Sequence, residues 1–141
     1  MDTILFICTH NSSRSILAEA LVNHSTTNYR GFSAGTAVTH VNPFTIKVLQ
    51  EHGIETEGLH SKDINQFINR KFDYVVTVCD SAKETCPFFP AIKKVIHAPF
   101  PDPSTLGSTD QEKLEIYRST LNVIARWLNQ EFGINFDLEN H

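Results

Sequence analysis

The chain has 141 residues, of which 40% are hydrophobic and 20% charged, with six glycines and six prolines. This composition indicates one globular domain over residues 1–141 and excludes intrinsic disorder and fibrous structure. The apolar runs are far shorter than the roughly 20 residues that span a bilayer, and the N-terminus lacks the basic start and cleavage site of a secretory signal. We therefore expect a cytoplasmic protein that does not associate with membranes.

The charge and the cysteine content narrow the function further. The net charge is −4, and the 12 lysines and arginines are scattered along the chain, which argues against a nucleic acid as the main partner. The chain has three cysteines, Cys8, Cys79 and Cys86, which is an odd number in a chain without a secretion signal. They are expected to be free thiols and not a structural disulfide framework.

Strand-like and helix-like segments alternate along the whole chain. Apolar runs predict strands over residues 3–8 and 72–78, with shorter ones ending at Gly35 and covering 94–97. Helical spacing of apolar residues predicts helices after Ser15, after the N-cap Asn42 as far as Gly53, over 63–70, and from the capping box Thr109-x-x-Glu112 to Gly133. This order predicts a three-layer α/β fold, with a four-stranded parallel sheet, helices on both faces and ligands beyond the carboxyl ends of the strands.

Residues 8–15 join the first predicted strand to the first predicted helix. A strand-to-helix loop points backbone N–H groups into one concavity, where the helix dipole adds a partial positive charge, so an oxyanion would be held there. The same field favours thiolate over thiol, which makes Cys8 a candidate nucleophile. Arg14 would bind the anion and stabilise developing charge, and Ser15 would donate a hydrogen bond to the Cys8 sulfur. The predicted oxyanion-binding residues are Thr9, His10, Asn11, Ser12, Ser13 and Arg14.

A plainer interpretation of this loop stays open, in which Cys8 is a small buried residue ending a strand and Arg14 is a solvated helix residue. The spacing Cys-x5-Arg-Ser near the N-terminus nevertheless resembles the low-molecular-weight protein tyrosine phosphatase family. That family takes its general acid from a late Asp-Pro pair, so the resemblance implies that Asp102 in Pro101-Asp102-Pro103 is the acid. The alternative is an ordinary Asp-Pro turn.

Cys79 is expected to end the third strand and so to share the carboxyl edge of the sheet with Cys8. Cys86 follows seven residues later, too far for a disulfide with Cys79 in a regular helix unless the segment unwinds. Both could instead be buried core thiols, since free cysteine is among the most buried residue types.

The three cysteines resemble those of the thioredoxin-coupled arsenate reductases, which share the phosphatase fold. The likeness runs over nearly the whole chain and includes Cys8 to Ser15, Ser33-Ala34-Gly35, Val41-Asn42-Pro43, Val76-Thr77-Val78-Cys79 with Cys86-Pro87, and Asp102-Pro103.

The resemblance implies a relay in which each cysteine acts once. Cys8 attacks arsenate, Asp102 protonates the leaving hydroxide, Cys79 attacks the Cys8 sulfur to release arsenite, and Cys86 resolves that disulfide. The resulting Cys79–Cys86 disulfide would be reduced by thioredoxin, or by glutaredoxin or glutathione. A monomer without a tightly bound cofactor is expected.

The sequence also departs from the family pattern around the loop. His10 stands where the family usually has glycine, and Ser13 replaces a cysteine that many relatives carry. Reductases of this type sometimes bind a monovalent cation, which here would lie at Asn11, Glu19, Ser33 and Asp63, although Lys62 could supply the positive charge instead. The seven histidines show no metal spacing with the cysteines, so no zinc site is expected.

Two other functions compete with arsenate reduction. A phosphotyrosine phosphatase would use Cys8, Arg14 and Asp102 in the same way and hydrolyse a cysteinyl phosphate with water. It would leave the two later cysteines idle, and Ser104 stands where phosphatases of this family typically carry tyrosine. A redox sensor without enzymatic activity would leave Arg14 and Asp102 unexplained.

Overall fold

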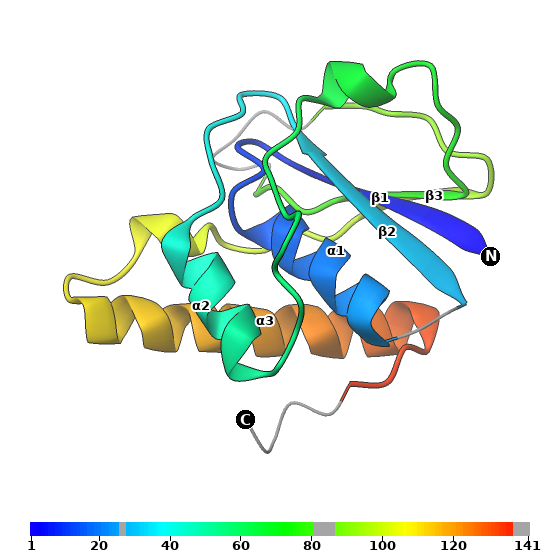
Figure 1. The fold of residues 1–141 in the computed structure, drawn as a ribbon. Helices are drawn as coiled ribbons and strands as arrows, with labels where there is room; N and C mark the ends of the chain where they lie inside the picture. Colours follow the sequence, from blue (N-terminus) through cyan, green and yellow to red (C-terminus); the bar gives the residue numbers. More distant parts are fainter. Residues whose placement is uncertain (26–27, 81–86, 137–141) are drawn as a thin grey trace.

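The computed structural model describes residues 1–25, 28–80 and 87–136. Within them, four parallel strands form one sheet in the order β2-β1-β3-β4 (Figure 1). The predicted four-stranded parallel α/β fold is therefore confirmed. The strands are β1 (Asp2–Cys8), β2 (Tyr29–Gly35), β3 (Tyr74–Thr77) and β4 (Lys94–His97); the helices are α1 (Arg14–Ser25), α2 (Pro43–Glu51) and α3 (Asp110–Phe132), with short 3-10 helices η1 (Ile64–Phe67) and η2 (Pro103–Thr105).

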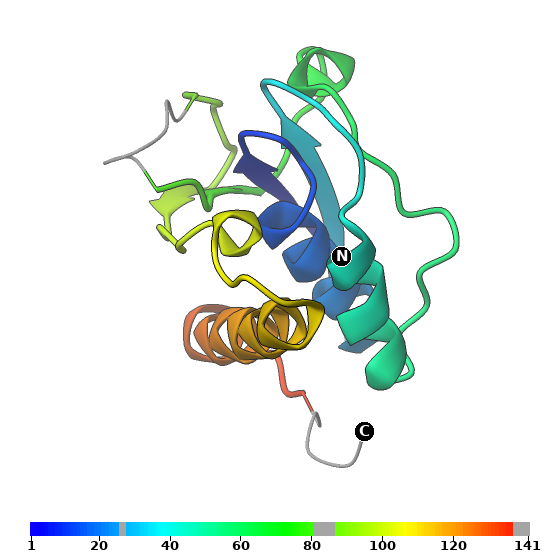
Figure 2. The ribbon, with the colours of Figure 1, turned by 90° about the vertical axis from the view of Figure 1, so that its left-hand side faces the viewer.

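The two faces of the sheet are covered by different structures (Figures 1 and 2). Ile4 and Phe6 of β1 pack in a core with residues of α1, α2 and α3, whereas Leu5 and Ile7 pack on the opposite face with residues of η1 and of segment 87–92. Right-handed crossovers explain this division. The chain passes from β1 to β2 through α1 and then reverses direction to reach β3; this second connection first adds α2 beside α1 and then covers the opposite face with η1.

The segment predicted as a helix over 63–70 forms only the single 3-10 turn η1. Asp63 caps it by accepting a hydrogen bond from the Asn65 backbone N–H, and Phe67 is its buried residue. Ile68, which the helical spacing assigned to the same apolar face, is 66% exposed. A segment this short cannot repay the cost of helix nucleation without packing along its whole length.

The other helix ends follow the signals in the sequence. Asn42 caps α2 through its side chain, and Pro43 occupies the first turn. Thr109 and Glu112 form both bonds of a capping box at the start of α3, and Gly133 ends that helix with a left-handed φ of 69°. None of the helices in the described part of the chain is long and apolar enough to cross a membrane.

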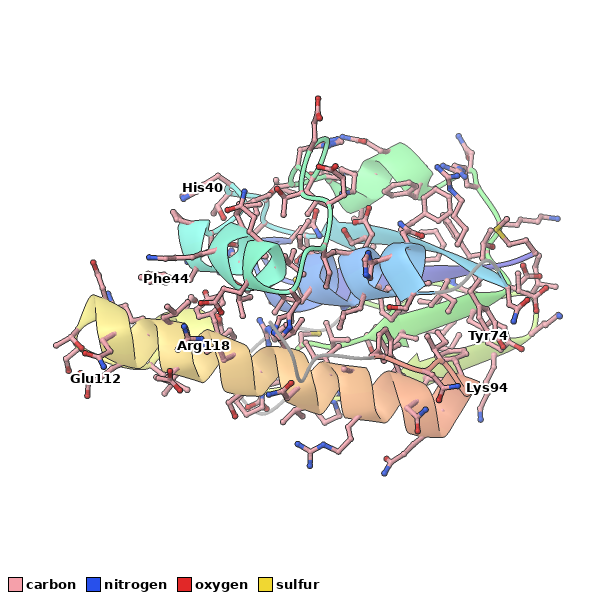
Figure 3. The ribbon with its side chains drawn as sticks, turned by 60° about the horizontal axis from the view of Figure 1, so that its bottom comes forward. His40, Phe44, Tyr74, Lys94, Glu112 and Arg118 are labelled. Atoms are coloured by element: carbon pink, nitrogen blue, oxygen red, sulfur yellow. The ribbon has the colours of Figure 1, made fainter. Side chains whose placement is uncertain are left out.

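An ion pair joins α2 to α3 on the surface of the helical layer. Arg118, labelled on α3 in Figure 3, donates hydrogen bonds of 2.9 and 2.5 Å to the two carboxylate oxygens of Glu51. It also bonds Glu115 one turn earlier. The hydrogen bond from Arg118 lowers the pKa of Glu51 below its ordinary value, and the charge of the guanidinium adds to the effect. Because the folded-state pKa is the lower one, the pair stabilises the fold above the unfolded pKa of 4.5 and loses this contribution as the pH falls through the folded value.

We therefore expect Glu51→Gln to flatten the acid side of the stability profile. The free energy of unfolding of the wild type should fall more steeply with decreasing pH below about 4.5 than that of the variant, measured by urea unfolding. Glu57→Gln, at an exposed position outside this pair, serves as the control and should keep the wild-type slope. Equal slopes for wild type and Glu51→Gln would contradict this role of the ion pair.

Candidate functional site

The Cys8 thiol lies at the end of β1, directly under the turn that leads into α1. Cys8 is a free cysteine and is buried. Its Sγ accepts a 3.2 Å hydrogen bond from the Asn11 backbone N–H and lies 2.8 Å from Ser15 Oγ. The Asn11 side-chain amide donates to Ser15 Oγ at 2.8 Å, which leaves the hydroxyl proton of Ser15 to point at the sulfur. Two donors therefore converge on Cys8 Sγ and stabilise negative charge on it.

Asn11 is the centre of the loop. Its φ of 48° lies in the left-handed region, which Asn tolerates better than most residues, and its side chain is fully buried. The side-chain oxygen accepts a 2.7 Å hydrogen bond from the Lys62 N–H, and the backbone carbonyl accepts one of 2.6 Å from Ser61 Oγ. A segment 50 residues further along the chain thus fixes the turn that positions the Cys8 thiol.

Gly35 allows β2 to approach this loop closely. A Cβ at this position would lie 2.7 Å from the Thr9 carbonyl oxygen and 2.9 Å from the Asn11 nitrogen, both of which are backbone atoms. The Thr9 carbonyl accepts hydrogen bonds of 2.9 Å from the N–H groups of Thr36 and Ala37. Gly35, the last residue of Ser33-Ala34-Gly35, therefore allows the loop to pack directly against the end of β2.

Arg14 and Asp102 face one cavity from different elements. Arg14 is buried, donates a 3.1 Å hydrogen bond to the Phe100 carbonyl, and has its Nη2 3.7 Å from Asp102 Oδ2. The other carboxylate oxygen of Asp102 accepts hydrogen bonds from the N–H and hydroxyl of Ser104, at 3.0 and 2.7 Å, as the cap of η2. The cavity has a volume of about 210 Å³ and is lined by Cys8, His10, Ser12, Ser13, Arg14, Thr39, His40, Asn42, Asp102 and Ser104.

This arrangement can bind a tetrahedral anion against a nucleophilic sulfur. Arg14 supplies a fixed positive charge, and the Asp102 carboxyl group in the same cavity can deliver a proton to a departing oxygen. His10 lines the cavity, and its Nδ1 lies 2.9 Å from the Ala37 carbonyl. Because a carbonyl only accepts, that nitrogen carries the proton. Asn11, and not His10, takes the left-handed backbone, so the loop accommodates a bulky side chain at position 10.

The helical spacing of apolar residues places Tyr117 on the apolar face of α3 and gives it no role in the loop. Its ring is buried, but its hydroxyl is hydrogen-bonded to Ser13 Oγ at 2.8 Å, which ties the loop to α3. Burial raises the pKa of the Tyr117 phenol, and the bond to Ser13 partly opposes this shift. The sequence does carry a signal for this role: a tyrosine among the leucines and isoleucines of a buried helix face needs a polar partner for its hydroxyl.

The loop is also held from α2. The Ser12 carbonyl accepts hydrogen bonds from the Asn42 N–H and from Thr45 Oγ1.

Of the two later cysteines, the structure describes only Cys79. β3 ends at Thr77, two residues before Cys79, so the strand is shorter than predicted. The Val78 N–H still donates to the Ile7 carbonyl at 2.8 Å, and Cys79 is fully buried at the same carboxyl edge as Cys8. Cys86 lies outside the described residues.

Two of the residues predicted to hold a monovalent cation, Glu19 and Ser33, are bonded to each other, and Lys62 contacts the same carboxylate. Lys62 Nζ donates to Glu19 Oε1 at 3.3 Å and to the His60 carbonyl at 2.7 Å, and Ser33 Oγ also donates to that Glu19 oxygen. Asp63 caps η1 instead. Lys62, the alternative source of positive charge, thus contacts Glu19 directly. Among the residues that the structure describes, no group of three His, Cys, Asp or Glu side chains is arranged to hold a metal ion.

Comparison with known proteins gives the family of the chain. The model of the low molecular weight phosphotyrosine protein phosphatase family matches residues 3–130, and the chain belongs to this family. The resemblance noted from the sequence is confirmed.

Curated relatives within the family are named arsenate reductases. One from Halalkalibacterium halodurans is 36% identical over 124 residues, which cover 87% of this chain and 89% of the relative. One from Bacillus subtilis is 32% identical over 128 residues, covering 90% and 92%.

Among solved structures, a thioredoxin-dependent arsenate reductase from Corynebacterium glutamicum is 26% identical with a TM-score of 0.65, covering 92% of this chain and 61% of that one. A low molecular weight protein tyrosine phosphatase from T. tengcongensis is 18% identical with a TM-score of 0.70, covering 92% and 97%. The fold is therefore common to reductases and phosphatases, and the side chains must distinguish them.

The contacts around Gly35 predict that Gly35→Ala weakens anion binding. The new methyl group meets backbone atoms of Thr9 and Asn11, so the loop itself must move. If phosphate occupies the cavity, it should raise the stability of the wild type by about 2.7 kcal/mol at 100 times its dissociation constant. A tenfold loss of affinity in the variant would reduce this gain by about 1.4 kcal/mol at the same concentration, visible as a smaller thermal shift.

Gly58→Ala separates this effect from general destabilisation. Gly58 has a φ of +88° and open space around it, so alanine there strains the backbone away from the cavity. We expect a lower melting temperature with an unchanged shift on adding phosphate. If Gly35→Ala also keeps the full phosphate shift, the close approach of β2 does not shape the anion site.

Proposed function

We propose that this protein reduces arsenate to arsenite through a three-cysteine relay. The observation that carries the proposal is the convergence of two hydrogen-bond donors on Cys8 Sγ, inside a cavity that also holds Arg14 and Asp102. Arsenate is a tetrahedral oxyanion of the kind such a cavity binds. The reductase names of the curated relatives at 36% and 32% identity support this choice of substrate.

In the first step the Cys8 thiolate attacks the arsenic atom. A sulfur–arsenic bond forms, and one oxygen of arsenate departs as hydroxide, which Asp102 protonates to water. Arg14 balances the charge that builds on the remaining oxygens, and its position is held by the Phe100 carbonyl. As the sulfur loses its negative charge, the hydrogen bonds from Asn11 and Ser15 weaken, and they strengthen again when the thiolate is released.

In the second step the Cys79 thiolate attacks Cys8 Sγ. A Cys8–Cys79 disulfide forms while the electron pair of the sulfur–arsenic bond passes to arsenic, which leaves as arsenite. Adjacent strands make this step feasible, because Ile7 pairs with Thr77 and strands in a sheet are about 4.8 Å apart. Both cysteines follow these paired residues at the same edge of the sheet.

In the third step Cys86 attacks the Cys79 sulfur, which releases Cys8 as a thiolate and leaves a Cys79–Cys86 disulfide. A dithiol donor, thioredoxin in our proposal, then reduces this disulfide and is itself oxidised. Two electrons thus pass from the donor to arsenic in each cycle. Such a relay requires a reducing compartment, which is why we assign the protein to the cytoplasm.

The alternative activity is hydrolysis of a phosphate ester by Cys8, Arg14 and Asp102. It explains the anion loop equally well, but it has no use for Cys79. Ser104, which lines the cavity beside Asp102, offers no aromatic ring for a phosphotyrosine substrate.

Arsenate-dependent consumption of NADPH, with thioredoxin and thioredoxin reductase, tests the relay. We expect turnover by the wild type and none by Cys8→Ser, Cys79→Ser or Cys86→Ser, because each sulfur forms a bond in the cycle. After one turnover, Cys86→Ser should accumulate a Cys8–Cys79 disulfide, detectable by mass spectrometry of peptides. If Cys8 alone hydrolyses p-nitrophenyl phosphate and no thiol donor supports arsenate reduction, the protein is a phosphatase.

Arg14→Lys tests the electrostatic part of the mechanism. Lysine keeps the charge but loses the planar fork that can hold two oxygens at once, so kcat/KM for arsenate should fall about 100-fold. Arg126→Lys, at an exposed position on α3, is the matched control and should leave kcat/KM unchanged. A loss of less than about threefold in Arg14→Lys would mean that Arg14 acts only as a point charge.

A further inference from the structure

A second concavity lies on the face of the sheet opposite the three α-helices. It has a volume of about 810 Å³ and shares no lining residue with the oxyanion cavity. Three of its side chains are large, apolar and open to solvent: Phe88 is 81% exposed, Ile68 66% and Ile92 62%. Exposed apolar residues are ordinary when they are single, but a cluster lining one groove is typical of a binding surface. We call this feature the back-face groove.

Both walls of the back-face groove are fixed. Segment 87–92 is anchored by Phe89, whose ring packs against Phe72 at 6.1 Å, and by a 2.8 Å hydrogen bond from the Ile92 N–H to the Phe72 carbonyl. The opposite wall is η1 and the residues after it, where the Arg70 guanidinium lies 4.7 Å from the centre of the Phe32 ring. The apolar side chains therefore stay exposed although the backbone that carries them is well held.

The charged side chains that line the back-face groove are all positive. Arg70 and Lys71 line it, and the described lining residues include no carboxylate, in a chain whose net charge is −4. Arg30 adds a second guanidinium close by, 5.5 Å from the same Phe32 ring. A complementary partner presents an apolar contact surface edged by acidic side chains.

We propose that the back-face groove docks the protein dithiol donor that reduces the relay. The inference rests on the proposed function and adds the surface that the donor uses. One wall of the groove begins at Pro87, the residue directly after Cys86 in the chain. A donor whose sulfur reaches the Cys79–Cys86 disulfide must contact the chain that follows Cys86, and there it meets Phe88. Because the groove and the oxyanion cavity have separate linings, the donor docks without covering the site where arsenate binds.

The test compares a protein reductant with a small one in the arsenate reduction assay. We expect Phe88→Asp and Lys71→Glu each to raise KM for thioredoxin about tenfold, which corresponds to about 1.4 kcal/mol of docking energy. Turnover driven by dithiothreitol should stay within about twofold of the wild type, because a small dithiol needs no docking surface. Val123→Asp, at an exposed apolar position on α3, and Lys47→Glu, at an exposed position on α2, are the matched controls and should leave both reactions unchanged.

The possible outcomes separate the docking surface from the activity itself. An unchanged KM for thioredoxin in both groove variants, with normal wild-type turnover, overturns the docking surface and leaves the relay intact. A wild type that reduces arsenate with neither reductant overturns both. Equal losses with thioredoxin and dithiothreitol mean that the groove supports the fold or the relay instead of docking. If the groove variants convert a dimer into a monomer in sedimentation experiments, the occupant is a second copy of the chain.

Discussion

The site depends on one residue, Asn11, whose left-handed backbone turns its own N–H toward Cys8 Sγ. Such a conformation is costly outside glycine and persists only where the surroundings hold it in place. Here the side-chain amide holds Ser15 and accepts from the Lys62 N–H, so a single buried residue fixes the nucleophile, its hydroxyl partner and a distant loop. The loop from Cys8 to Ser15 is therefore held in place by the protein's own contacts, as the proposed mechanism requires.

The parallel arrangement of the strands then brings the other residues of the site to the carboxyl edge of the sheet, where Cys8 lies. β1 lies between β2 and β3, so Gly35, Cys8 and Cys79 follow one another across three neighbouring strands. Asp102 reaches the cavity from the connection after β4, where it also caps η2. The α-helices cover one face of the sheet, and η1 and segment 87–92, in the connections before and after β3, cover the other. That division separates the oxyanion cavity from the back-face groove.

The sequence by itself determined the strands, the helix caps and the position of the loop that joins Cys8 to Arg14. These features are local: apolar runs, N-caps such as Asn42 and Thr109, and the spacing from Cys8 to Arg14 all act within a few residues. The same local logic failed over 63–70, where the apolar spacing of a helix was present but the packing along its length was not.

Only the tertiary structure decided how the loop is held and what surrounds it. Tyr117, Lys62 and Gly35 lie far from Cys8 in the chain, and their contacts with the loop depend on how the helices and strands pack. It also placed Lys62 at the Glu19 carboxylate, because the adjacent Lys62 and Asp63 in the sequence do not reveal which of the two side chains reaches Glu19. The back-face groove was equally hidden, because Ile68 and Phe88 are ordinary apolar residues until the fold leaves both exposed along one groove.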